Sequence, residues 1–143
     1  MKFAHCRWVL LSLVCALALV VARRSHGYDS STWFEDAPGF ADAARQQAHQ
    51  HAPMLVYFHT DWCPYCKKVD SLLEDAEVRS RLANVIKVRV NPEHGDAERN
   101  LFDRRYGARG YPAIFWVPSE TAAPRRISGK GPAREFLAQL TDG

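Results

Sequence analysis

Two cysteines three residues apart follow a continuous apolar run, and this combination constrains the fold more than any other feature of the chain. The run is Met54-Leu55-Val56-Tyr57-Phe58-His59, and the pair lies in Trp62-Cys63-Pro64-Tyr65-Cys66. A short apolar run without alternation is typical of a strand buried on both faces. The apolar residues after the pair recur at helical spacing. We therefore expect a buried strand, the cysteine pair and a helix from about Pro64 to Asp75.

The chemistry expected of the pair follows from its position at a helix start. If Cys63 caps the helix and Pro64 takes the first helical position, the sulfur faces unpaired N–H groups and the positive end of the helix dipole. Such placement favours the thiolate and can lower a cysteine pKa from about 8.5 to ~3.5–7.5. Cys66 is expected on the same helix face, within disulfide reach. Cys63 is therefore predicted to attack a substrate disulfide, and Cys66 to resolve the mixed disulfide.

The rest of the chain predicts alternating helices and strands. Residues 28–38 show no clear period and are expected to lead into the fold. Helices are predicted over 40–51, 64–75, 77–82, 97–106 and 132–140, and strands over 54–59, 85–90, 113–117 and 125–128. The strand–helix–strand start predicts a parallel pair, and the last two strands are close enough to form a hairpin. This order predicts an α/β fold, with a central mixed sheet and helices on both faces.

The first 27 residues differ from the rest. Lys2 and Arg7 precede an apolar run over 8–22, which is shorter than the ~20 residues of a membrane span and typical of a signal peptide. We expect cleavage near Gly27 and export to the periplasm or beyond the cell. The alternative is a membrane anchor formed by the uncleaved segment. The remaining residues, 28–143, are long enough for one domain.

Removing residues 1–27 changes both the charge and the cysteine count. Four of the 19 lysines and arginines lie there, so 15 remain against 16 acidic residues. This balance gives no indication of nucleic-acid binding, which favours a clustered basic face. Cys6 and Cys15 also leave, so Cys63 and Cys66 are the only cysteines of the expected mature domain. A disulfide-stapled scaffold would carry several spaced cysteines, so the pair is predicted to be chemical rather than structural.

Two segments carry a family resemblance. The run Asp61-Trp62-Cys63-Pro64-Tyr65-Cys66-Lys67, with Gly110-Tyr111-Pro112 before a later strand, resembles the thioredoxin superfamily over about residues 40–140. It is most similar to periplasmic thioredoxin-like proteins and the C-terminal domain of the membrane thiol:disulfide interchange reductase. The resemblance implies a thioredoxin fold, a cis peptide before Pro112 and a substrate-facing Trp62. It also implies that Tyr111 offers its backbone to an extended substrate beside Pro112.

Two departures from the family leave the redox direction open. Pro64-Tyr65 is the dipeptide of glutaredoxins, whereas thioredoxins have Gly-Pro between the cysteines. Thioredoxins also carry a buried aspartate six residues before the first cysteine, and here that position is Tyr57. The usual proton acceptor for the second cysteine is therefore missing. Water, Asp61 or Lys67 is expected to substitute for it.

These features together predict an exported thiol–disulfide oxidoreductase that acts on protein disulfides. No bound cofactor or metal is expected, because the electrons travel through the cysteines. We expect a monomer that acts as a reductant and is recharged by a membrane electron donor. A disulfide-forming oxidant of the same fold is the nearest alternative. Others are a copper-handling protein that uses Cys63, Cys66 and His59, and a chaperone-like peptide binder with an idle cysteine pair.

Overall fold

The computed structural model describes residues 32–140, so the proposed signal peptide and its cleavage site lie outside the described residues. The elements are β1 (Phe34–Glu35), α2 (Asp36–Gln50), β2 (Met54–Phe58), α3 (Pro64–Leu73), α4 (Ala76–Arg81), β3 (Ile86–Val90), α5 (Asp96–Asn100), the π-helix η1 (Leu101–Arg105), β4 (Ala113–Val117), β5 (Arg125–Ile127) and α6 (Ala133–Leu137). None of the helices between residues 32 and 140 is long and apolar enough to cross a membrane.

The five strands form one mixed sheet in the order β1-β3-β2-β4-β5. Strands β2 and β3 are parallel, with Met54 opposite Ile86 and Phe58 opposite Val90. Strand β4 runs antiparallel to both β2 and β5. The predicted parallel pair and the predicted terminal hairpin are therefore confirmed, and so is the mixed sheet.

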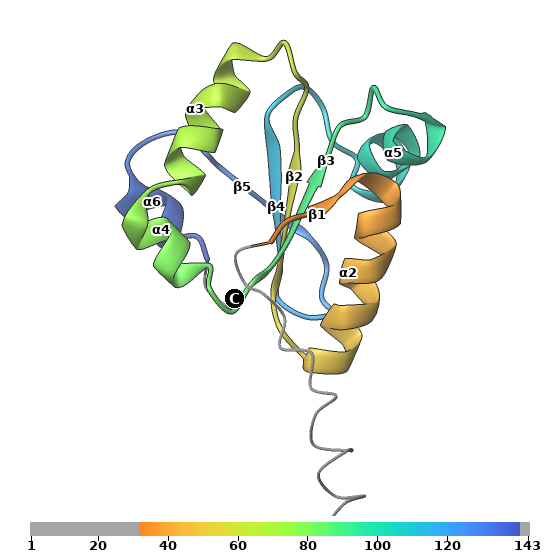
Figure 1. Ribbon diagram of the computed structural model, residues 1–143, viewed down its shortest axis with the longest axis horizontal. Helices are drawn as coiled ribbons and strands as arrows, with labels where there is room; N and C mark the ends of the chain where they lie inside the picture. The colour runs from red at the N-terminus through yellow and green to blue at the C-terminus, as the bar shows by residue number, and fades with distance from the viewer. Residues whose placement is uncertain (1–31, 141–143) are drawn as a thin grey trace, which may run out of the picture.

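Helices cover both faces of the sheet (Figure 1). Helices α3, α4 and α6 lie on one side of it, and α2 and α5 lie on the other. The side chains of β2 alternate between the two resulting cores. Met54, Val56 and Phe58 belong to the core beneath α2, whereas Leu55 and Tyr57 belong to the core beneath α3. All five are buried, which explains why this strand reads as an unbroken apolar run.

Two expected segments differ from the structure. Residues 28–38 were expected only to lead into the fold, and within them Phe34 and Glu35 form the strand β1, which pairs in parallel with β3. Two residues are too short to show a sequence period. The helix predicted over 97–106 is instead α5 followed by η1, whose last turn closes with the Tyr106 N–H donating to the Leu101 carbonyl at 3.0 Å. The five-residue spacing of that bond is characteristic of a π-helix.

Candidate active site

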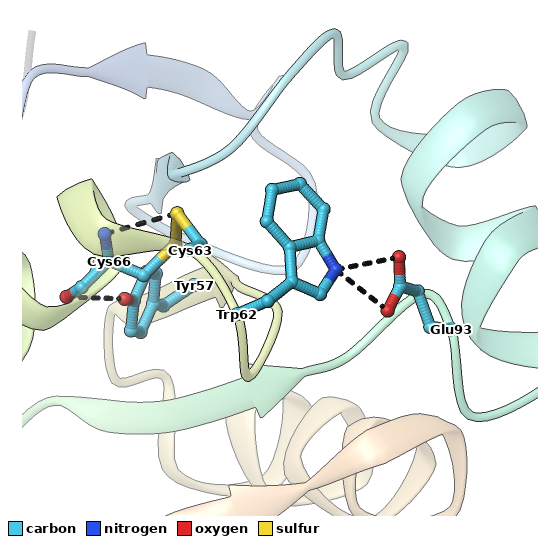
Figure 2. The surroundings of a disulfide bond; sticks show 5 residues. All are labelled: Tyr57, Trp62, Cys63, Cys66 and Glu93. Atoms are coloured by element: carbon cyan, nitrogen blue, oxygen red, sulfur yellow. Dashed lines mark hydrogen bonds between the residues drawn. A yellow bond between two sulfur atoms is a disulfide. The ribbon is translucent and has the colours of Figure 1, made fainter.

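The two cysteines form a disulfide at the start of α3 (Figure 2). Cys63 is the N-cap residue, with extended backbone angles, and Pro64 occupies the first helical position. The Cys66 N–H donates a hydrogen bond to the Cys63 sulfur at 3.1 Å. An N-cap sulfur that accepts a backbone N–H bond is stabilised as thiolate when the disulfide opens. The geometry thus places at Cys63 the electrostatic environment that favours an attacking thiolate.

Burial does not distinguish the two cysteines in the disulfide state. A nucleophile at a helix start would be expected to be more exposed than its resolving partner, yet the exposed fractions are 3% for Cys63 and 2% for Cys66. Both belong to the core beneath α3. The difference lies in polar contacts, because within residues 32–140 a helix N–H donates to the Cys63 sulfur and none donates to the Cys66 sulfur. Roles are therefore assigned by helix position rather than by solvent exposure.

Trp62 lies on the surface beside the disulfide. Its side chain is 63% exposed, and its indole Nε1–H donates to both carboxylate oxygens of Glu93 at 3.1 Å (Figure 2). Its ring also meets the Tyr111 ring edge-on, with 6.1 Å between centroids. The two contacts hold an exposed aromatic ring in a fixed orientation beside the disulfide.

The Tyr111–Pro112 peptide bond is cis, as the family resemblance implies. Gly110 precedes it with a φ of +69°, a conformation that residues with a side chain rarely adopt. The Tyr111 ring packs against Phe102 of η1, with 5.0 Å between centroids, so the π-helix supports this loop. Within residues 32–140, no backbone hydrogen bond involves Tyr111, which leaves its N–H and carbonyl available to an extended partner.

Tyr57 lies fully buried beneath the cysteines, and its hydroxyl donates to the Cys66 carbonyl at 3.1 Å (Figure 2). Burial raises the pKa of Tyr57 far above its ordinary value, and the charge of Asp70 acts in the same direction. Tyr57 therefore cannot accept a proton at neutral pH. Asp70 lies one helical turn after Cys66, and its Oδ1 is buried without a hydrogen-bond partner. A carboxylate on α3 therefore lies within electrostatic reach of Tyr57, the residue at the position of the family's aspartate.

His59 is half-buried, and its ring lies 5.4 Å from the Tyr57 ring. Burial lowers its pKa, and the positive charge of Arg89 lowers it further. Among residues 32–140, no group of three histidine, cysteine or carboxylate side chains is arranged to hold a metal ion. The ligand set proposed for copper handling, Cys63, Cys66 and His59, is therefore not assembled in this structure.

Sequence reasoning missed two residues of this site. Asp70 is four residues after Cys66, a spacing that places two side chains on one helix face, so the signal was present. The two substitutes expected for the missing acceptor, Asp61 and Lys67, are both exposed. Glu93 had no comparable signal, because it reaches Trp62 from the loop after β3, 31 residues away.

The fold and the site define a class of protein: a small redox domain with a cysteine-pair disulfide at a helix start and a cis-proline loop beside it. Residues 33–119 match the family model described as thioredoxin-like. This chain therefore belongs to the thioredoxin-like family and is a redox protein of that family, with Cys63–Cys66 as its disulfide.

Individual relatives agree with the family assignment. The chain is 33% identical over 101 residues to the thiol:disulfide interchange protein DsbD of Ralstonia nicotianae, covering 69% of this chain and 17% of that protein. It is 29% identical to the protein disulfide isomerase-like 2-2 of Oryza sativa subsp. japonica, covering 92% of this chain and 34% of that one. The chain thus spans a minor part of each of these relatives.

Solved structures show the same fold. A thioredoxin from Thermus thermophilus is 27% identical, with a TM-score of 0.60 and coverage of 76% of this chain and 82% of that one. The oxidised C-terminal domain of DsbD from Neisseria meningitidis is 21% identical, with a TM-score of 0.62 and coverage of 76% and 96%.

Proposed function

We propose that this chain is an exported thiol–disulfide oxidoreductase that reduces disulfides in protein substrates. The observation that carries the proposal is the Cys63 sulfur at the N-cap of α3, where it accepts the Cys66 N–H at 3.1 Å. This environment favours the thiolate, which is the nucleophile in disulfide exchange. Trp62, Tyr111 and Pro112 form the surface that receives the substrate beside it.

The reaction proceeds in two exchanges. The Cys63 thiolate attacks one sulfur of the substrate disulfide, whose S–S bond breaks, and the other substrate sulfur leaves as a thiolate. The Cys66 thiolate then attacks the Cys63 sulfur and releases the first substrate sulfur. The substrate gains two electrons and two protons, and Cys63 and Cys66 become a disulfide. A membrane-bound dithiol donor, through the same exchange in reverse, restores the reduced pair.

The reducing direction is supported by the similarity to a thiol:disulfide interchange protein. A second candidate is disulfide formation or isomerisation, because a relative of similar identity is a protein disulfide isomerase-like protein. The reduction potential separates the two directions. A Cys63–Cys66 potential near about −270 mV indicates a reductant, and one near about −120 mV a strong oxidant. Equilibration with glutathione redox buffers measures it.

Trapping tests the division of roles. Cys66→Ala leaves Cys63 able to attack and removes the resolving thiol, so mixed disulfides with a disulfide-containing protein should accumulate. Cys63→Ala should trap almost none, because the Cys66 sulfur accepts no helix N–H bond. Non-reducing gels with mass spectrometry measure both. Equal trapping by the two variants would overturn the assignment, and no trapping by either would overturn the proposed activity.

A further inference from the structure

The charged side chains that line a groove beside the disulfide are all positive. It has a volume of about 1160 Å³ and extends from Tyr65 in the first turn of α3, past Pro112, to the loop after β5. Its charged lining residues are Lys68, Arg109, Arg126 and Lys130, and no aspartate or glutamate lines it. Four cations from three separate parts of the chain therefore converge on the groove that borders the reactive cysteines.

These cations are available to a partner. All four are exposed. The ion pairs of residues 32–140 join other residues, so none of the four takes part in one. The Lys68 ammonium lies over the Tyr65 ring, 5.4 Å from its centroid, and Arg126 donates to the Arg109 carbonyl at 3.2 Å. Neither contact neutralises a charge.

The charge reverses on the other side of the disulfide. On that side the indole N–H of Trp62 donates a hydrogen bond to the Glu93 carboxylate. Asp61, which precedes Trp62 in the chain, is exposed. A polypeptide lying across the cysteines thus meets negative charge at one end and positive charge at the other. The Glu135 carboxylate lies beside Gly131, a lining residue at the far end of the groove. Lys68, Arg109 and Arg126 are therefore the cations on which the positive charge of the groove depends.

We propose that this groove binds an acidic, extended segment of the protein substrate, adjacent to the cysteine that Cys63 attacks. The proposal rests on the proposed disulfide exchange and adds the class of substrate. Complementary charge speeds encounter and fixes the orientation of a bound partner. The backbone of Tyr111 pairs with the substrate segment. The carboxylates of that segment contact the cations of the groove. Substrates with aspartate or glutamate on that side of the cysteine are then preferred over neutral ones.

The test uses three disulfide compounds and the reduced protein. One peptide carries glutamates beside its cystine, a matched peptide carries glutamines, and glutathione disulfide supplies small-molecule carboxylates. Stopped-flow measurements give the second-order rate constant for each. The acidic peptide should react about tenfold faster than the neutral one at low salt, and the ratio should fall in 0.5 M NaCl because salt screens exposed charges. Glutathione disulfide should show no such advantage.

Charge-reversal variants locate the effect. Arg109→Glu with Arg126→Glu should bring the acidic-to-neutral ratio to one or below, and Lys68→Glu on α3 should lower it independently. The matched control is Arg79→Glu with Arg81→Glu on α4, which changes the net charge equally and should retain the ratio.

The outcomes separate the groove from the activity it rests on. If the wild type reduces none of the compounds, the proposed function fails. If it reduces both peptides at equal rates, the function holds and the groove proposal is overturned. A glutathione disulfide rate equal to that of the acidic peptide would also overturn it, by showing a small-anion site.

Discussion

At the scale of single residues, the proposed exchange requires that Cys66 lose a proton before it attacks the mixed disulfide. Cys66 is buried, and burial raises the pKa of a thiol. Tyr57, which contacts the Cys66 carbonyl, holds its own proton more tightly than an exposed tyrosine does. Asp70 is half-buried four residues after Cys66, and its Oδ1 atom is buried with no hydrogen-bond partner. It is therefore the group best placed to take the proton, directly or through a water molecule.

Asp70→Asn should slow the decay of the mixed disulfide by ~10- to 100-fold near pH 7, because general-base assistance is typically of this order or larger. The difference in decay rate between Asp70→Asn and the wild type should decrease as the pH rises toward the Cys66 pKa, because solvent then removes the proton unaided. Stopped-flow decay of a preformed mixed disulfide between pH 6 and 9 measures this. Glu74→Gln, at the exposed C-terminus of α3, is the matched control. Equal decay rates in Asp70→Asn and wild type would show that Asp70 takes no part.

At the scale of elements, the β3–α5 loop determines where Glu93, and with it Trp62, lies. Asp36 joins this loop to α2, because its carboxylate accepts the Asn91 N–H at 2.9 Å and bonds the His94 ring at 2.7 Å. Asp36 has a φ of +58°, which aspartate tolerates better than most residues. The two hydrogen bonds fix the β3–α5 loop to the start of α2. Glu93 of the same loop then accepts the indole N–H of Trp62, which fixes the Trp62 side chain beside the disulfide.

The hydrogen bond to Asp36 raises the pKa of His94 above its ordinary value of 6.5. The protonated pair therefore stabilises the folded loop fully below pH 6.5, and the effect is lost as the pH rises through the raised pKa. The indole N–H resonance of Trp62 should shift over that range in NMR titrations. His94→Gln should abolish the shift, whereas His49→Gln on α2 should leave it intact. A Trp62 titration that persists in His94→Gln would show that the loop does not depend on this pair.

In the β5–α6 connection, Gly129 packs so closely against α3 and β4 that there is no room for a side chain at this position. A Cβ atom on Gly129 would come within 2.7 Å of Val69 and 2.8 Å of Ile114. Gly129→Ala should therefore lower the free energy of unfolding by ~1–3 kcal/mol, the usual cost of overpacking. Gly107→Asn is the control, because its Cβ would meet open space and asparagine tolerates the positive φ found there. Urea denaturation measures the free energy of unfolding of both variants. An equal decrease in Gly129→Ala and Gly107→Asn would contradict the packing argument.

At the scale of the whole molecule, the features that could be predicted from the sequence are those that depend on a local pattern of residues. The unbroken run over 54–59 and the spacing of the cysteines specify a buried strand that leads into a capped helix, and both are present. Contacts between distant loops were not predictable. Glu93 reaches Trp62, and four cations converge beside Pro112, only once the chain has folded. Strand β1 was missed because two residues carry no period.

The stability of the whole molecule should also depend on pH through His59, with the sign opposite to that of His94. Burial and then Arg89 lower its pKa below 6.5, so the unfolded chain binds this proton more readily than the folded one. Stability is therefore full above pH 6.5 and falls as the pH decreases from there through the lowered pKa. His59→Asn removes the titrating group and should flatten the decline on the acid side.

Urea unfolding free energies from pH 4.5 to 8 measure this slope in the wild type, His59→Asn and the exposed-histidine control His49→Gln. The slope, rather than the absolute stability, is the readout, because replacing a half-buried ring also removes its packing against Tyr57. The control should keep the acid-side slope of the wild type. If His59→Asn keeps it as well, His59 binds its proton equally well in the folded and unfolded chains, and the carboxylates alone account for the loss of stability in acid.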